Sequence, residues 1–201
     1  MIRRIIFLAL MASTLFAAEK PFVRVRWKGS SVRLTYKEKL MVYDYGVPDE
    51  SGRFLVYAVD TVKTEYLAEK ENVVYMILDV RGPSRGPQAA MSYCGAGTEA
   101  AKILFAFDRN GEVKPPQIAI YESCYLTLEP MMDDLELANG ERALAKFEMY
   151  PAAPAGHLIT KTVLKRFNAE HPEAGITSSE TCTDRDMEDK SGATKDIPCA
   201  K

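Results

Sequence analysis

Apolar and polar residues alternate with a period of two over several short stretches of this 201-residue chain. The first two stretches, residues 22–27 and 31–36, are separated by the dipeptide Gly29-Ser30. Alternation places successive side chains on opposite faces of a strand, and a glycine-containing dipeptide between two such runs is typical of a tight turn. The pattern therefore predicts a β-hairpin at residues 22–36.

A second hairpin is predicted around Asn110-Gly111. Residues 103–107 and 117–121 are apolar runs on either side of this dipeptide. Asn-Gly fits the two positive φ angles of a type I′ turn. Such a turn fixes a register in which Cys124 does not lie opposite Cys94, so a disulfide between these two cysteines requires a bulge or a bend in the strands.

Further strands follow from the same alternation and from β-branched and aromatic residues. They are predicted at residues 40–45, 53–60, 73–80, 125–129 and 136–150, the last with a hairpin turn at Asn139-Gly140.

Three stretches depart from the strand pattern. Residues 61–72 are a polar link that can hold a helical turn, and residues 82–87 form an irregular exposed loop because they contain two prolines and two glycines. Residues 158–171 are predicted as a helix, since Val163, Leu164 and Phe167 are spaced for one helical face.

Many short strands with turn signals between them predict a mainly β fold, an antiparallel sandwich or barrel built of hairpins with one late helix. An α+β fold is the alternative. A single β-rich domain is expected over residues 19–175. Residues 176–201 are polar and acidic, and we expect them to be disordered apart from a small disulfide loop.

Residues 1–18 have the pattern of a cleavable signal peptide. Arg3 and Arg4 precede an apolar run at residues 5–16, and Ala17-Ala18 supplies a small-residue cleavage site. The apolar run is shorter than the roughly 20 residues that span a bilayer, so no membrane anchor is expected. The pattern predicts export to the periplasm, and the paired arginines leave twin-arginine export as an alternative to the general route.

Removal of Arg3 and Arg4 with the signal changes the formal net charge from -2 to -4. A mildly acidic chain lacks the strongly basic character of a dedicated nucleic-acid-binding domain. We therefore expect no nucleic-acid partner.

The chain has four cysteines, Cys94, Cys124, Cys182 and Cys199, all in the part predicted to be exported. An even number of cysteines in an oxidising compartment predicts two disulfides, with three possible pairings. Proximity in sequence favours Cys94 with Cys124 and Cys182 with Cys199. Each closed loop would stabilise the fold by roughly 3 to 4 kcal/mol. The cysteine spacing does not match a zinc site, and no metal is predicted.

No motif in the sequence predicts catalysis. Residues 95–100 match G-x-G-x-x-A, but no strand is predicted directly before them, so no dinucleotide cofactor is expected. A nucleophilic role for Cys94 would need a nearby base, and His157 and His171 are the only histidines. Acidic residues cluster at 184–189 without the spacing of a calcium loop. We therefore predict no catalytic residue and no cofactor.

The first hairpin offers a candidate binding surface. A turn at Gly29-Ser30 places Val25 opposite Leu34 on one face and Arg26 opposite Arg33 on the other, with Arg24 nearby. Directly opposed like charges repel each other. Solvent alone can face these arginines, the acidic C-terminal residues can fold over them, or an anionic partner can bind to them.

These observations predict an exported, non-enzymatic binding module of the inhibitor or immunity type. It would act through an exposed loop or through the basic hairpin face with Arg24, Arg26 and Arg33. The expected partner is an acidic protein or an anionic component of the cell envelope. A periplasmic enzyme with an unrecognised site and an accessory structural protein of the envelope are the alternatives.

Overall fold

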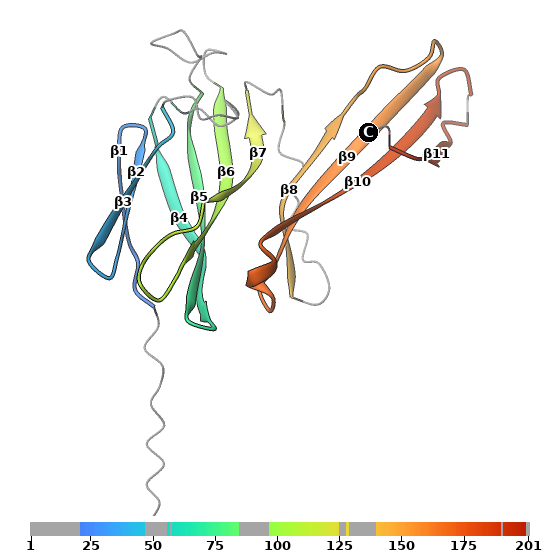
Figure 1. Ribbon diagram of the computed structural model, residues 1–201. Helices are drawn as coiled ribbons and strands as arrows, with labels where there is room; N and C mark the ends of the chain where they lie inside the picture. Colours follow the sequence, from blue (N-terminus) through green and yellow to red (C-terminus); the bar gives the residue numbers. More distant parts are fainter. Residues whose placement is uncertain are drawn as a thin grey trace, which may run out of the picture.

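The computed structural model describes residues 21–46, 56, 58–84, 97–124, 128, 140–189 and 191–199. These residues form three antiparallel sheets of three, four and four strands. Within these ranges, the only helical element is the 3-10 turn η1, Pro172–Ala174. The predicted mainly β fold built of hairpins is confirmed (Figure 1).

The first sheet contains β1 (Arg24–Lys28), β2 (Ser31–Tyr36) and β3 (Lys39–Asp44), in the order β1-β2-β3. The predicted hairpin and its register are confirmed, because Val25 pairs with Leu34 and Arg26 pairs with Arg33.

The middle sheet contains β4 (Thr61–Lys70), β5 (Val73–Pro83), β6 (Thr98–Phe107) and β7 (Gln117–Ser123), in sequence order. The third sheet contains β8 (Glu141–Met149), β9 (His157–Asn168), β10 (Ile176–Asp186) and β11 (Thr194–Ile197), in the order β11-β10-β9-β8.

The middle sheet is buried on both faces and separates two hydrophobic cores. Along β5, Val74, Met76 and Leu78 belong to the core shared with the first sheet. The intervening Tyr75 and Ile77 belong to a second core shared with the third sheet. The molecule is therefore a three-layer stack, with the first and third sheets on opposite sides of the middle one (Figure 1).

Aromatic pairs connect neighbouring layers. The Tyr36 and Phe107 ring centroids lie 5.4 Å apart between the first and middle sheets. The Tyr66 and Phe167 centroids lie 4.9 Å apart, edge to face, between the middle and third sheets. Offset and edge-to-face ring contacts of this kind stabilise a core beyond the area they bury.

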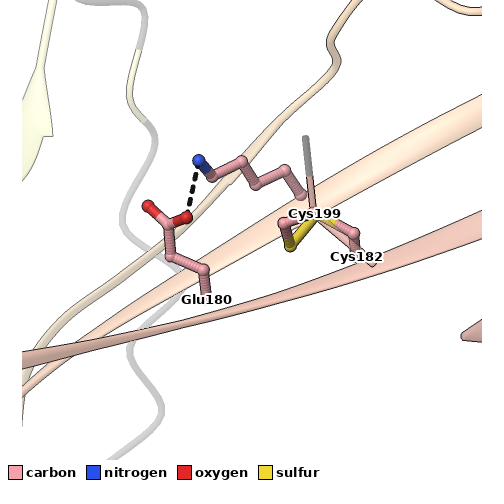
Figure 2. Close-up of a disulfide and its surroundings, with 4 residues drawn as sticks. Glu180, Cys182 and Cys199 are labelled. Atoms are coloured by element: carbon pink, nitrogen blue, oxygen red, sulfur yellow. Dashed lines mark ion pairs between the residues drawn. A yellow bond between two sulfur atoms is a disulfide. The ribbon is translucent and has the colours of Figure 1, made fainter. Parts of the chain in front are cut away.

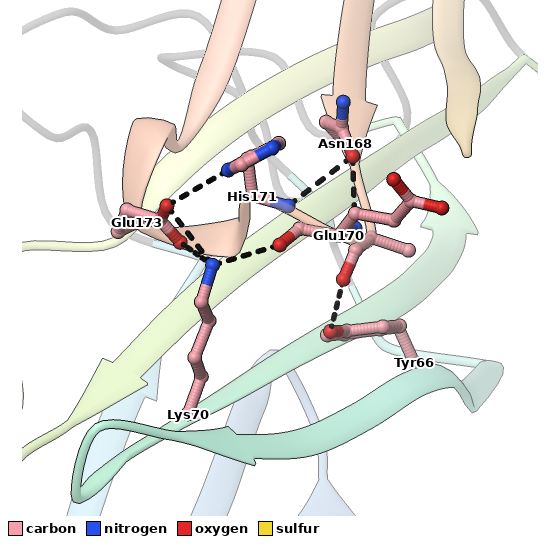
Figure 3. Close-up of polar contacts among 7 residues, drawn as sticks. Tyr66, Lys70, Asn168, Glu170, His171 and Glu173 are labelled. Atoms are coloured by element: carbon pink, nitrogen blue, oxygen red, sulfur yellow. Dashed lines mark hydrogen bonds and ion pairs between the residues drawn. The ribbon is translucent and has the colours of Figure 1, made fainter. Parts of the chain in front are cut away.

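Polar contacts add to the joint between the middle and third sheets, shown in Figure 3. Tyr66 Oη donates a hydrogen bond to Ala169 O at 3.1 Å. Lys70 Nζ donates to Glu170 O at 2.8 Å and lies 3.0 Å from Glu173 Oε2. One edge strand of the middle sheet, β4, thus holds the segment that connects β9 to η1.

The helix predicted at residues 158–171 is wrong, because residues 158–168 lie in the strand β9. Val163 and Phe167 are buried, and residues four apart lie on one face of a strand as well as of a helix. Leu164, which completed the helical face, lies one position from Val163 and therefore points to the other side of the sheet. Neighbouring β-branched residues, among them Ile159 and Thr160, favour the strand.

The polar link predicted at residues 61–72 is also wrong, because it forms β4 and the turn to β5. A β-bulge between Thr64 and Tyr66 changes the alternation, so that Val62 and Leu67 both pack on the same core although they are five residues apart. The turn places Glu71 and Asn72 at positive φ, 53° and 64°, without a glycine to signal it.

The disorder predicted for the C-terminal residues is wrong as well. β10 pairs with β9 along its whole length, from Ile176 with Phe167 to Asp186 with His157. Its polar residues are largely threonine and serine. The backbone groups of β10 are hydrogen-bonded by pairing with β9, so the strand forms although few of its side chains are buried. Cys182 is its one fully buried side chain.

The predicted hairpin around Asn110-Gly111 exists, but its turn differs. Only Gly111 has positive φ, 76°, and Asp108 N donates to Glu112 O at 2.8 Å, so the loop has three residues in place of two. The strand register matches the prediction from Leu104 to Ala101, where a shift follows. This is a bulge of the kind expected before Cys124.

The irregular loop predicted at residues 82–87 begins later than expected, since Gly82 and Pro83 are the last residues of β5 and Ser84 forms a bridge with Val56. Residues 85–87 lie outside the described part of the chain. So do the signal peptide at residues 1–18, Asn139, and most of the strands expected at 53–60, 125–129 and 136–150 before Gly140.

Candidate functional site

The three predicted binding residues Arg24, Arg26 and Arg33 are exposed on the outer face of the first sheet. They alternate with inward-facing residues, of which Val32 and Leu34 are fully buried in the core. The outer face also carries other exposed residues. We use the term basic face for the set Arg24, Arg26, Lys28, Arg33, Leu40 and Val42.

The strand register places these residues in rows across the sheet. Arg26 pairs with Arg33, and Arg33 pairs in turn with Val42 on β3. In the next row Arg24 and Leu40 both pair with Thr35. The positive residues therefore lie on the two strands β1 and β2. On β3 the same face carries the apolar Leu40 and Val42 and, in the row of Lys28 and Ser31, the exposed carboxylate Asp44.

Leu40 and Val42 were missed by the sequence reasoning. Their side chains are 61% and 53% exposed. The signal was present in the run Leu40-Met41-Val42-Tyr43, because apolar residues at every position of an edge strand leave some of them facing solvent. An apolar patch beside cations changes what the face can bind, since it adds an area that gains from desolvation.

The cations of the basic face form no ion pair with any carboxylate in the described part of the chain. The Arg26–Arg33 repulsion is thus left to water and salt, at a cost on the order of a few tenths of a kcal/mol. Arg26 and Arg33 present guanidinium groups, which bind carboxylate or phosphate oxygens with two parallel hydrogen bonds.

The acidic C-terminal residues do not cover the basic face. They belong to β10, β11 and the turn between them, in the third sheet, and this sheet packs on the opposite side of the middle sheet (Figure 1). Of the three alternatives for these arginines, the intramolecular cover is therefore excluded for the described residues.

The predicted disulfide between Cys182 and Cys199 is present, with a Cα–Cα distance of 5.2 Å. Figure 2 shows it next to the ion pair between Glu180 and Lys161, whose N–O distance is 2.8 Å. Cys124 is also disulfide-bonded. Its predicted partner Cys94 lies outside the described residues.

The two histidines each lie beside a carboxylate. His157 Nδ1 is 3.0 Å from Asp184 Oδ1, and His171 Nδ1 is 3.1 Å from Glu173 Oε1. In the described ranges, no group of three or more His, Cys, Asp or Glu residues could hold a metal ion. The motif at residues 95–100 runs into β6, which starts at Thr98, and so precedes a strand where dinucleotide binding needs a helix.

A polar network that sequence reasoning also missed lies on the face of the middle sheet toward the third sheet. Tyr121 Oη donates to Asp79 Oδ1 at 2.6 Å, and Lys102 forms an ion pair with Glu65. Burial, followed by the Asp79 carboxylate, raises the pKa of Tyr121 well above its usual value. Arg81 lies 3.8 Å from Asp79. Each charge of this network therefore has an opposite neighbour.

In the part of the chain that is described, no helix has the length and apolar character needed to cross a membrane. Comparison with protein-family models, curated proteins and solved structures finds no match.

Proposed function

We propose that this protein is an exported, periplasmic binding module of the inhibitor or immunity type, and that its basic face binds an acidic protein surface. The observation that carries the proposal is the exposed pair Arg26 and Arg33. These two arginines face each other directly, without an ion-pair partner among the described residues, beside the exposed side chains of Leu40 and Val42.

The composition of the basic face favours a protein partner. Protein interfaces are enriched in arginine, methionine and aromatic residues, and they are depleted in lysine, glutamate and aspartate. The basic face contains three arginines and one lysine, and the exposed Asp44 lies beside it on β3. Arg33 and Val42 are direct neighbours across β2 and β3, so a partner carboxylate and a partner apolar side chain can be contacted together.

Two observations support the exported location. The first is the signal-like pattern of residues 1–18. The second is that Cys124, Cys182 and Cys199 are disulfide-bonded, as is usual for proteins of oxidising compartments.

The proposal is tested with residues 19–201 and two anionic probes, immobilised poly-L-glutamate and vesicles containing phosphatidylglycerol. We expect binding to poly-L-glutamate that weakens with added salt. Arg33→Thr should weaken it by about 1 to 3 kcal/mol, because a charge-assisted contact is lost. Arg142→Thr is the matched control, since Arg142 is an exposed strand residue of the third sheet and should leave binding unchanged.

Two results would contradict the proposal. Poly-L-glutamate binding that responds neither to salt nor to Arg33→Thr would remove the basic face as the binding surface. Binding only to vesicles, again dependent on Arg33, would assign the face to a lipid surface and reject a protein partner.

A further inference from the structure

The outer end of the third sheet carries a second exposed surface, of opposite charge. Four consecutive residues here are exposed: Asp186, which ends β10, and Met187, Glu188 and Asp189 of the turn that follows. We call these four residues the acidic turn. Met187 is 58% exposed. Hydrogen bonds from the Ser191 hydroxyl, and then from the Ser191 backbone N–H, keep the pKa of the Asp189 carboxyl below its usual value.

The carboxylates of the acidic turn are engaged only locally. Asp186 Oδ1 accepts a hydrogen bond from Glu188 N at 2.8 Å, and Asp189 Oδ1 accepts one from Ser191 N at 2.9 Å. None of the three carboxylates forms an ion pair with a lysine or arginine of the described ranges. Arg185 precedes and Lys190 follows these residues in the sequence, so the three negative charges of the turn are partly offset, although none forms an ion pair within the described ranges.

The exposed large apolar side chains of the described residues divide between these same two regions. One set lies on the first sheet and two residues before it, and the other lies at the outer end of the third sheet. The first set is Phe22, Trp27, Leu40 and Val42, and the second is Met149, Tyr150 and Met187. Trp27 pairs with the buried Val32 and so lies on the other face of the first sheet from Arg26. Each region thus combines exposed apolar area with an excess of one charge, with Asp44 beside the basic residues and Arg185 beside the acidic ones.

The two regions cannot meet within one molecule. The first sheet and the third sheet pack on opposite sides of the middle sheet, and Figure 1 shows the outer end of β9 and β10 at the far side of the molecule from β1–β3. Complementary surfaces at opposite ends can come together only between molecules, in a head-to-tail contact.

We infer that the basic face of one copy docks on the acidic turn of a second copy, so that the acidic partner is the protein itself. This inference rests on the proposed function, because it names the occupant of the same basic face. Such a contact uses two different surfaces, and it therefore generates either a closed ring or an open chain of molecules.

Sedimentation velocity with residues 19–201 tests the inference. We expect association that grows with protein concentration at about 50 mM NaCl and is largely lost at about 500 mM, where exposed charges are screened. Two charge-reversal variants are compared with the wild type. The first is Arg26→Glu with Arg33→Glu, and the second is Asp186→Lys with Glu188→Lys.

Each variant alone should raise the dissociation constant at least about tenfold, because both of its surfaces then carry charge of the same sign. A mixture of the two variants should associate again, since each now offers the surface that the other lacks. Arg142→Glu, a reversal outside both surfaces, is the control and should associate like the wild type.

A wild type that remains monomeric up to about 100 μM at low salt would overturn the inference. So would two well-folded variants, checked by circular dichroism, whose mixture fails to associate. If the first variant does not fold, Arg33→Thr takes its place and must weaken association. The poly-L-glutamate experiment tests the proposed function separately, because binding to this probe can persist when self-association is absent.

Discussion

At the scale of single residues, strand register could be predicted where the residues of a tight turn are recognisable in the sequence. The opposition of Arg26 and Arg33 was predictable because Gly29 and Ser30 mark the turn and a two-residue turn fixes the register. The turn from β2 to β3 places Lys37 and Glu38 at positive φ, 47° and 65°. Charged residues rarely adopt that conformation, so nothing in the sequence identified it.

Gly82 is a residue whose role only the structure reveals. A Cβ atom at this position would lie 2.0 Å from Ala58 O and 3.0 Å from Ala58 C. Because the obstacle is backbone, it cannot rotate away, and Gly82→Ala should lower the free energy of unfolding by about 1 to 3 kcal/mol. Urea denaturation measures the loss.

Gly29→Ala is the comparison for this prediction. Gly29 has φ of 57° with nothing within 4 Å of an added Cβ, so its substitution reports backbone strain alone, roughly 1 kcal/mol. A smaller loss for Gly82→Ala than for Gly29→Ala would show that the chain near Ala58 moves aside easily.

At the scale of elements, strands were identified where alternation was regular and misassigned where it was not. β9 was mistaken for a helix because the spacing of Val163 and Phe167 fits both periods. β4 was mistaken for a link because its bulge shifts the apolar positions. β10 was mistaken for a disordered tail because a strand that takes its stability from pairing needs few apolar residues.

Truncation after Gly175 should therefore destabilise the protein. It removes β10 and β11, leaves β9 unpaired on one edge, and deletes Ile176, whose backbone N–H donates to Gln117 Oε1 of β7 at 2.6 Å. We expect a large fall in melting temperature and a tendency to aggregate through the open edge of β9, measured by thermal denaturation and light scattering.

The double variant Cys182→Ser, Cys199→Ser separates the stability contributed by the strand β10 from that contributed by the disulfide. It keeps β10 and removes only a bridge of sequence separation 17, which is worth about 3 kcal/mol in the chain-entropy model. The truncation should cost more than this variant. Equal losses would mean that the strand contributes little beyond the disulfide.

At the scale of the whole molecule, the sequence predicted a mainly β fold, a sandwich or barrel of hairpins, and the structure stacks its hairpins in three layers where a sandwich has two. The sequence signal for a third layer is β5, whose residues from Val74 to Leu78 are all buried. A strand that is apolar at every position needs cover on both faces. The three-layer stack separates the basic face from the acidic turn. This separation could not be predicted from the sequence, because it depends on which sheet covers which face.

The joint between the middle and third sheets should respond to acid through Glu173. Hydrogen bonds from its own backbone N–H, then from Lys70 and His171, hold the pKa of the Glu173 carboxyl at about 2, below the ordinary 4.5. A depressed folded-state pKa stabilises the fold above the ordinary value, and the effect is lost as pH falls toward the folded value. The difference in unfolding free energy between wild type and Glu173→Gln should therefore be full above about pH 5, should shrink between pH 4.5 and about 2, and should vanish below.

Urea titrations of both proteins across this pH range give the measurement, and Lys70→Met provides the control. Lys70 Nζ contacts Glu173 and the carbonyl of Glu170, so its loss should reduce the pH-dependent difference. The backbone hydrogen bond remains in that background, and a smaller difference should persist. A difference that is as large at pH 2 as at neutral pH would show that Glu173 acts through packing rather than through its charge, and the joint would then hold in acid.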